Sequence, residues 1–268
     1  TDTNKVMRHL AKTDLFFLLV CVLKRKDADY DWLYDRCKEV YEAPNSHLDL
    51  WARAFYKSTI ITFALTIQDI LKDPDTTVGI FSYTRPIAKA FLRQIKREFE
   101  ENALLKGLFP EIFYDKPKTQ SPKWSENDGI VVKRSMNPKE STVEACGLID
   151  SMPTSRHYSL RVYDDIVSDS SVTSPEMLNK VTAAWGLSQS LGTEHGVLRV
   201  VGTRYHFADT YSVILQRKSL TPRIYPATHD GTEMGDPIFL TRESLKAKRR
   251  DMGAYIYACQ MFSLAYLN

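Results

Sequence analysis

The residues whose types and spacing point to chemistry begin with Lys57, Ser58 and Thr59. They follow a short apolar run with the character of a strand and precede an apolar run with helical character. Strand, loop, Lys-Ser/Thr and helix, in that order, are the parts of a phosphate-binding loop, where amide groups at the helix start and the lysine face an anion. The usual glycines of G-x-x-x-x-G-K-[ST] are replaced by Trp51 and Tyr56. The alternative is an exposed helix start with a solvated lysine.

Two adjacent carboxylates, Asp164 and Asp165, stand toward the end of an apolar segment at 159–167 that is predicted to be a strand. Because Mg²⁺ prefers hard oxygen ligands, Asp164 is a candidate metal ligand together with the Ser58 hydroxyl. Asp165 could then orient or deprotonate an attacking water. The alternative is a pair of aspartates that cap a loop. Neighbouring strand residues point to opposite faces, so the pair does not by itself build a two-metal nuclease site.

A third predicted strand, 195–203, ends in a small polar turn at Gly202, Thr203 and Arg204. A threonine at this place can sense a γ-phosphate and report hydrolysis to a mobile segment; the alternative is a plain turn. Ligands in open α/β sheets bind at the carboxyl ends of strands. The three strand ends are therefore expected to gather around one triphosphate.

Strands and helices alternate over most of the chain, which predicts an α/β fold with a mainly parallel sheet flanked by helices. Residues 1–46 are expected to form a helical lid and residues 103–128 to be rich in loops. Strands are predicted at 48–52, 77–83, 129–134, 142–149, 159–167, 195–203 and 223–227, and helices at 58–71, 85–102, 175–190, 208–218, 242–251 and 253–262.

Composition limits the class of protein. The chain has 268 residues and a formal net charge of only +3, so a nucleic-acid site must be a local patch. The helix at 85–102 has a basic face, which is either solvated or in contact with DNA. The longest uncharged apolar run of the chain, Leu15–Leu23, is far shorter than the roughly 20 residues of a membrane span. The four cysteines show no metal or disulfide spacing and are expected to be reduced, buried thiols in an intracellular protein.

Several segments, in the same order, resemble the ATPase portion of the large terminase subunit of tailed double-stranded-DNA bacteriophages, the motor that packages DNA. The segments are ARAFYKST, FSYTRPIAKAFLRQIKREFEENALLKGLFPEIF, STVEACGLIDSMPTSRHYSLRVYDDIV, VVGTRYHFADTYSVIL, YPATHDG and YIYACQMF. The resemblance implies a P-loop NTPase fold of the additional-strand type. It also implies an N-terminal lid at 1–46, an ATPase core at 47–220 and a C-terminal subdomain or linker at 221–268, with no nuclease domain and no DNA cleavage expected.

The resemblance further implies residue roles. Lys57 would contact the β- and γ-phosphates, Arg53 would sense the γ-phosphate, and Ser58 and Asp164 would hold Mg²⁺. Asp165 would stand at the position of the catalytic carboxylate. Arg156 is the candidate for an arginine finger that reaches the nucleotide of a neighbouring subunit. The nucleotide-binding loop would comprise Arg53, Ala54, Phe55, Tyr56, Lys57, Ser58 and Thr59, and the coupling segment Gly202, Thr203 and Arg204.

The implied cofactors are ATP and Mg²⁺. The implied partners are double-stranded DNA, the portal protein of the procapsid, the small terminase subunit and further copies of the chain in a pentameric ring, in the host cytoplasm and without a membrane. The chain departs from the family at Ala54 and Ser155, where glycine is expected, and at Ser159, where aspartate is expected. Because alanine enters positive φ less easily than glycine, the loop is expected to be rearranged. Two alternatives remain: a helicase-like DNA translocase, and a catalytically weak P-loop scaffold for assembly.

Overall fold

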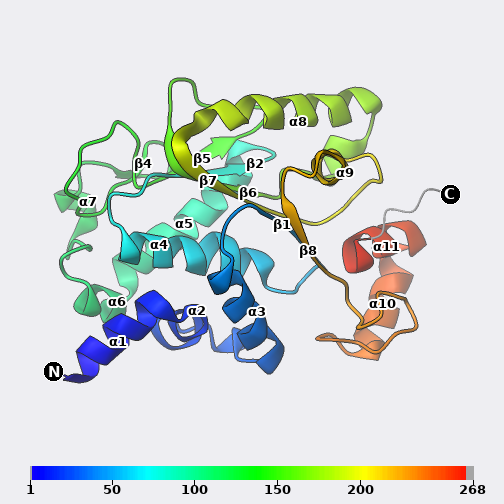
Figure 1. Ribbon diagram of the computed structural model, residues 1–268, viewed down its shortest axis with the longest axis horizontal. Coiled ribbons are helices and arrows are strands. Elements are labelled where there is room, and N and C mark those ends of the chain that lie inside the picture. Colours follow the sequence, from blue (N-terminus) through cyan, green and yellow to red (C-terminus); the bar gives the residue numbers. More distant parts are fainter. Residues whose placement is uncertain (1, 264–268) are drawn as a thin grey trace.

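An eight-stranded sheet runs through the molecule in the order β3-β4-β5-β2-β6-β7-β1-β8 (Figure 1). The structure is a computed structural model that describes residues 2–263. The strands from β5 to β8 in this order are parallel, and the short edge strands β3 and β4 are antiparallel. The strands are β1 His47–Trp51, β2 Val78–Ser82, β3 Trp124–Ser125, β4 Gly129–Ile130, β5 Val143–Gly147, β6 Tyr158–Asp164, β7 Gly192–Gly202 and β8 Thr221–Tyr225.

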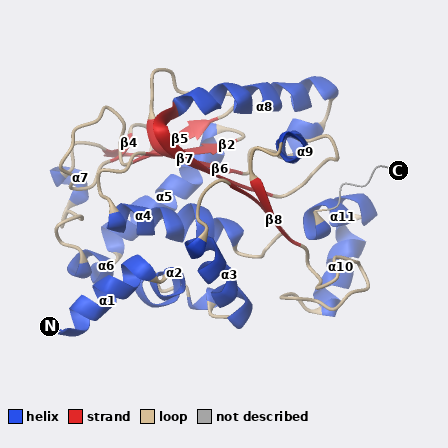
Figure 2. Cartoon of the chain, viewed as in Figure 1, coloured by secondary structure: helices blue, strands red, loops and turns tan. Residues whose placement is uncertain are grey.

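Helices cover both faces of this sheet (Figure 2). The N-terminal helices, α4, α5 and α6 lie on one side, and α8 and α9 on the other. Two helical stretches, Leu18–Val22 and Thr59–Leu65, are π-helical. The α-helices are α1 Asp2–Thr13, α2 Leu15–Phe17, α3 Asp31–Glu42, α4 Thr66–Lys72, α5 Arg85–Glu101, α6 Ala103–Leu108, α7 Pro117–Gln120, α8 Pro175–Ser188, α9 Thr210–Arg217, α10 Arg242–Met252 and α11 Ala254–Phe262.

Successive strand residues pack into different cores, as the alternation of side chains along a strand requires. Ile80 of β2 and Val162 of β6 belong to the core beneath the N-terminal helices, α4 and α5. Their neighbours Phe81 and Tyr163 belong to the core beneath α8 and α9, where the two rings stack at 5.0 Å. Burial on both faces explains why these strands are continuous apolar runs in the sequence.

One strand separates the strand before the phosphate loop from the strand that ends in Asp164. β7 lies between β1 and β6, and it pairs Gly202 with Leu50 on one side and Val201 with Asp164 on the other. The parallel register brings the ends of all three strands to the same edge of the sheet. This inserted strand has the place of the additional strand that the family resemblance implies.

The N-terminal helices are part of the larger core. Ala11, Leu18 and Leu33 are fully buried in it, and Gln68 of α4 donates a hydrogen bond from Nε2 to the Ala11 carbonyl at 3.1 Å. The predicted division at 1–46, 47–220 and 221–268 stays a prediction, and its residues 1 and 264–268 lie outside the described part of the chain. Within the described part, no helix is both long enough and apolar enough to cross a membrane.

Some predicted elements differ in the structure. The segment 103–128, expected to be loops, contains α6, α7 and β3, and the strand expected at 129–134 has only two residues. β6 ends at Asp164, before the expected 167, because Asp165 has a left-handed φ of +51° that breaks the extended backbone. Three cysteines are buried as expected, but Cys21 is exposed.

Candidate functional site

The loop after β1 takes the shape of a glycine-containing loop without glycine. Ala54 has φ +71° and Tyr56 has φ +59°, both in the left-handed region. Ala54 stands where the family has glycine. Tyr56 stands directly before the lysine, where the general motif has glycine. The backbone therefore keeps the turns that glycine would supply, although a residue with a Cβ is strained there by about 1–3 kcal/mol. The expected rearrangement of this backbone is not what the structure shows.

The two bulky residues of the loop are held by aromatic packing. Phe55 is fully buried, and its ring lies 5.2 Å from Trp32 of α3 and 5.6 Å from Phe239. The Tyr56 ring lies 5.8 Å from the same Phe239. Both rings therefore point toward the aromatic cluster, and their contacts offset the strain of the left-handed positions.

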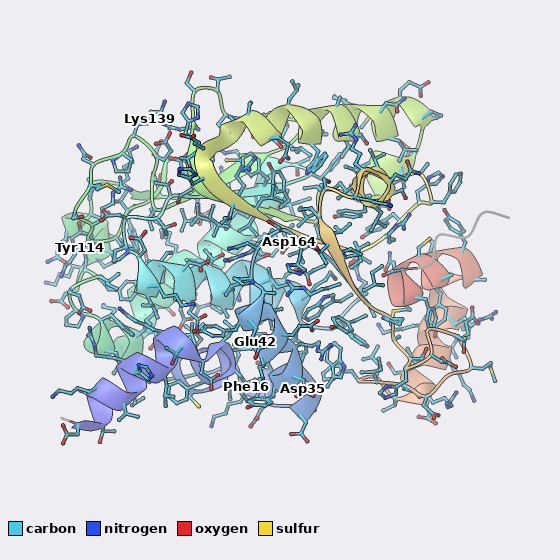
Figure 3. All side chains as sticks on the ribbon, in the orientation of Figure 1. Phe16, Asp35, Glu42, Tyr114, Lys139 and Asp164 are labelled. Carbon is cyan, nitrogen blue, oxygen red and sulfur yellow. The ribbon has the colours of Figure 1, made fainter. Side chains whose placement is uncertain are left out.

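Lys57 and Ser58 begin the helix that follows, and they meet the end of β6. The Ser58 hydroxyl donates to Asp164 Oδ1 at 3.1 Å, and the Thr62 hydroxyl donates to Asp164 Oδ2 at 2.5 Å. Asp164 is fully buried near the centre of the molecule, as Figure 3 shows. Lys57, whose exposed fraction is 7%, is close enough to Asp164 and Asp165 for both carboxylates to raise its pKa. The structure thus brings together the predicted loop and the predicted acidic pair.

Burial dominates the electrostatics of this site. It raises the pKa of Asp164 well above its usual range, and the neighbouring charge of Asp165 raises it further; Thr62, Lys57 and Ser58 act in the opposite direction. Burial also lowers the pKa of Lys57, against the attraction of the two aspartates. A buried carboxylate that lacks a full positive partner is a favourable place for a cation, because the cation would offset this penalty.

The main chain holds Asp165 at the sheet edge. Its amide donates to the Val201 carbonyl of β7 at 3.2 Å, and its carbonyl accepts from the Tyr83 amide, just past β2, at 3.1 Å. The left-handed φ turns the chain at this point, so Asp164 and Asp165 do not follow the alternation of a strand. The Asp165 side chain is half-buried, which leaves a path to solvent.

The third predicted strand end lies beside the other two, and its side chains have structural contacts. A Cβ built on Gly202 would lie 2.1 Å from the Tyr211 hydroxyl oxygen, so only glycine fits. Thr203 is buried. The Arg204 guanidinium donates to Asp209 Oδ2 at 3.2 Å and also bonds the start of α9 through Ser212. Arg204 therefore connects the end of β7 to α9 and does not face the phosphate loop.

Arg53 contacts two segments that sequence reasoning did not connect to the loop. Its Nη1 donates to the Tyr205 hydroxyl at 3.1 Å, and its amide donates to the Gln260 carbonyl of α11 at 3.0 Å. These residues border a cleft of about 650 Å³, which Lys248 and Met252 of α10 also line. The cleft places the C-terminal helices next to the phosphate loop.

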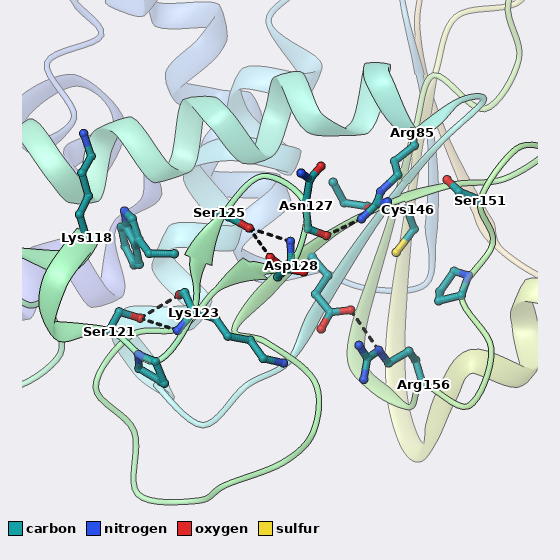
Figure 4. Close-up of a pocket in the computed structure, with 15 residues that line it drawn as sticks. Arg85, Lys118, Ser121, Lys123, Ser125, Asn127, Asp128, Cys146, Ser151 and Arg156 are labelled. Carbon is teal, nitrogen blue, oxygen red and sulfur yellow. Dashed lines mark hydrogen bonds and ion pairs between the residues drawn. The ribbon is translucent and has the colours of Figure 1, made fainter.

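Arg156 lies away from this site. It comes just before β6, whereas Asp164 ends that strand, and a seven-residue strand separates its two ends by about 20 Å. The Arg156 Nε lies 3.4 Å from Glu144 Oε2 of β5 (Figure 4). The predicted finger is therefore not brought to the phosphate loop of its own chain. Ser155 before it has φ +58°, again at an expected glycine.

Sequence reasoning missed three residues of the site: Thr62, Tyr205 and Gln260. Thr62 follows Ser58 by four positions, and that helical spacing is a signal that could have found it. Tyr205 and Gln260 are brought to Arg53 by long-range contacts that no local spacing reveals. Among residues 2–263 no group of three or more His, Cys, Asp or Glu side chains could hold a metal. Ser58 and Asp164 supply two oxygen donors 3.1 Å apart, a small set that suits Mg²⁺ because that ion usually keeps water and phosphate ligands.

Comparison with solved structures identifies the fold. The large terminase of bacteriophage HK97 superposes with a TM-score of 0.53 and 14% sequence identity, over 88% of this chain and 50% of that chain. The large terminase of a thermophilic bacteriophage, in complex with ADP, superposes with a TM-score of 0.50 and 13% identity, over 84% of this chain and 50% of that chain. This chain thus spans about half the length of the structures that it resembles.

No protein-family model matches the sequence, and no curated protein matches it significantly. The resemblance to large terminases that the sequence suggests is confirmed for the fold. With its largely parallel sheet, flanking helices and inserted strand, the chain has the α/β P-loop NTPase fold that the sequence predicts.

Proposed function

We propose that this chain is the ATP-hydrolysing motor of a viral terminase, which moves double-stranded DNA into a procapsid. The observation that carries the proposal is the junction of Lys57, Ser58 and Asp164. A buried lysine and a hydroxyl from the phosphate loop meet a buried carboxylate, 3.1 Å from the hydroxyl, at the end of β6. This set of groups suits a triphosphate and its metal ion. The fold shared with the large terminases of HK97 and of the thermophilic bacteriophage supports it, as does the ADP complex of the latter.

The residues have distinct roles in the proposal. Lys57 neutralises charge on the β- and γ-phosphates, and Arg53 turns to the γ-phosphate. Ser58 and Asp164 hold Mg²⁺, which when bound neutralises phosphate charge. Asp165 orients or deprotonates the attacking water. Burial of Lys57 and Asp164 supports these roles, because a water-poor site strengthens each electrostatic contact.

The coupling role of Gly202, Thr203 and Arg204 is supported by their contacts. Arg204 reaches the N-terminal cap of α9 through Asp209, so a shift of the β7 end would move that helix. For Arg156, a finger in a neighbouring subunit's site is the remaining role, since it lies far from its own phosphate loop. A pentameric ring on the portal, with a small terminase subunit and in the host cytoplasm, completes the proposal.

ATP hydrolysis by wild-type protein and by Lys57→Ala, with and without duplex DNA, tests this function. We expect Mg²⁺-dependent turnover that DNA stimulates, and a loss of at least about a hundredfold in the variant. The matched control is Lys72→Ala, which removes a lysine at the far end of the same helix, where Nζ donates to Gln68. Equal, negligible turnover in wild type and Lys57→Ala would favour the assembly scaffold. Strand separation driven by ATP would favour the helicase-like translocase.

A further inference from the structure

The protein's excess positive charge is concentrated in one segment. Residues 116–139 contain six Lys and Arg and only two Asp and Glu, a formal charge of +4. The whole chain carries +3, so all the other residues together carry −1. The segment includes α7, β3 and β4 and forms the edge of the sheet beside β5. A local patch of this kind is what a nucleic-acid site requires in a nearly neutral protein.

A pocket of about 560 Å³ lies where this segment meets β5 and the start of α5, and Figure 4 shows it in close-up. We call it the basic pocket; its charged lining residues are Arg85, Lys118, Lys123, Asp128, Glu144 and Arg156. The other lining is mixed: Ser121, Ser125, Asn127 and Ser151 are small and polar, whereas Pro122, Trp124, Ala145, Cys146 and Pro153 are apolar. Four cations against two acids give the charged lining a formal charge of +2, which favours an anionic ligand.

The cations of the basic pocket are poorly neutralised. Arg85 donates from Nε to the Ala145 carbonyl at 3.2 Å and from Nη2 to the Asn127 carbonyl, and Lys123 donates to the Lys139 carbonyl at 3.3 Å. Within residues 2–263 neither side chain forms an ion pair with a carboxylate. Glu144, the buried acid of the pocket, pairs with Arg156 at 3.4 Å and also accepts from the Ser141 amide and the Tyr158 hydroxyl, so it neutralises neither Arg85 nor Lys123.

The basic face of α5 differs in this respect. Arg93 pairs with Glu126 at 2.7 Å, Lys96 with Glu100 at 2.9 Å and Arg97 with Glu101 at 2.8 Å. Lys118, by contrast, is largely exposed, and its contact with Glu100 is long, at 3.9 Å. The surplus charge therefore lies on segment 116–139 and in the basic pocket, to which α5 contributes Arg85 from its first turn. It does not lie on the acid-paired part of α5 at Arg93, Lys96 and Arg97.

We infer that segment 116–139, together with Arg85 of the basic pocket, binds the phosphate backbone of duplex DNA. The choice of DNA as the ligand rests on the proposed function. Carbonyl-bound arginine and lysine side chains offer positive charge to phosphate oxygens without reading bases, as a motor that moves along any sequence requires. The site is separate from the nucleotide site of its own chain: three strands lie between β5 and β1, a separation of about 19 Å.

The test is binding of two short fluorescein-labelled duplexes of unrelated sequence, measured by anisotropy without nucleotide, for wild type and Lys118→Ala/Lys123→Ala. The double variant should lose at least about tenfold in affinity for both duplexes, and the slope of log K against log salt should fall by about 1.8. The control is Arg97→Ala/Arg250→Ala, which removes two exposed, acid-paired charges and should bind as wild type does. Equal melting temperatures verify folding.

Wild-type affinity and slope in the lysine variant would overturn the inference. The inference would also be overturned if the lysine variant lost affinity for pyrophosphate but kept its affinity for duplex DNA. The pocket would then be a site for a small phosphate ligand. The assay contains no nucleotide, so the two proposals can fail separately. A protein that hydrolyses no ATP would overturn the proposed function, whereas weaker duplex binding by the lysine variant would still support the DNA site.

Discussion

Arg53 and Tyr205 are joined by a hydrogen bond of 3.1 Å, although 152 positions separate them in the sequence. The bond connects the phosphate loop with the segment that follows β7. The guanidinium that we propose for the γ-phosphate is therefore shared with the Tyr205 hydroxyl, and the two acceptors compete for it.

Removing the competitor should strengthen ATP binding. A hydrogen bond of this kind contributes about 0.5–1.5 kcal/mol net, so Tyr205→Phe should bind ATP up to about tenfold more tightly. ADP, which has no γ-phosphate, should bind as it does to wild type. Calorimetric titration with both nucleotides measures the difference, and an unchanged ratio of ATP to ADP affinity would contradict the assignment of Arg53.

Glycine should relieve strain at Ala54. Its φ of +71° costs an L-residue about 1 kcal/mol or more, and its side chain is exposed, so little packing is lost. We expect Ala54→Gly to raise the free energy of unfolding by about 1 kcal/mol in urea denaturation. Ala90→Gly, at an exposed position inside α5, is the control and should lower it by a similar amount. A destabilised Ala54→Gly would show that the loop is not strained.

Thr62 should matter to both stability and hydrolysis. Thr62→Val keeps the shape but removes the donor to Asp164 Oδ2, which leaves a buried carboxylate oxygen without this partner. The expected loss is about 1–3 kcal/mol in the free energy of unfolding. Turnover should also need more Mg²⁺, because Asp164 is less firmly positioned. Thr62→Ser, which retains the hydroxyl, should behave like wild type; a Thr62→Val protein with wild-type Mg²⁺ dependence would argue against a positioning role.

The buried charge of Asp164 should make metal-free stability depend on pH. Its pKa in the folded protein is raised to about 7, against about 3.9 unfolded. The folded state therefore holds this proton more tightly, so the contribution of Asp164 to stability is fully present below about pH 4 and is lost as pH rises through about 7.

Asp164→Asn cannot lose a proton there. In EDTA its stability relative to wild type should rise between pH 5 and pH 8, by on the order of 1–4 kcal/mol. Thermal melting of both proteins across this pH range measures the effect. A constant difference between them would show that Asp164 titrates normally. Asp164→Asn should also fail to hydrolyse ATP, so the gain in stability comes with a loss of activity.

The sequence allowed the local parts of the site to be predicted. Lys57 and Ser58 are adjacent in the chain, and Asp164 closes an apolar run, so motif and hydrophobic pattern were enough. A strand at 195–203 also followed from the apolar pattern, whereas its insertion between β1 and β6 was implied only by the family resemblance. These features depend on neighbours in sequence, where propensity and periodicity act directly.

Other features depend on contacts between distant segments. Nothing near Tyr56 in sequence indicates that Phe239 holds its ring, and therefore that a non-glycine residue can stay left-handed there. The contact of Arg156 with Glu144 of β5 is likewise one that local spacing does not indicate. The strand predicted at 129–134 is too long, because the apolar residues that follow Ile130 do not continue β4. The Val131 amide donates to the Lys123 carbonyl outside any strand.

The aromatic cluster around Phe55 has a consequence for mutation. A glycine-containing loop can adopt left-handed φ angles without strain. This loop instead depends on packing of Phe55 against Trp32 and Phe239, which lie far from it in the sequence. Substitutions at Trp32 or Phe239, outside the loop, should therefore affect the conformation of the loop. Substituting Phe239, which contacts both Phe55 and Tyr56, would remove packing that offsets the strain at Tyr56, and the first damage would be to the geometry at Lys57.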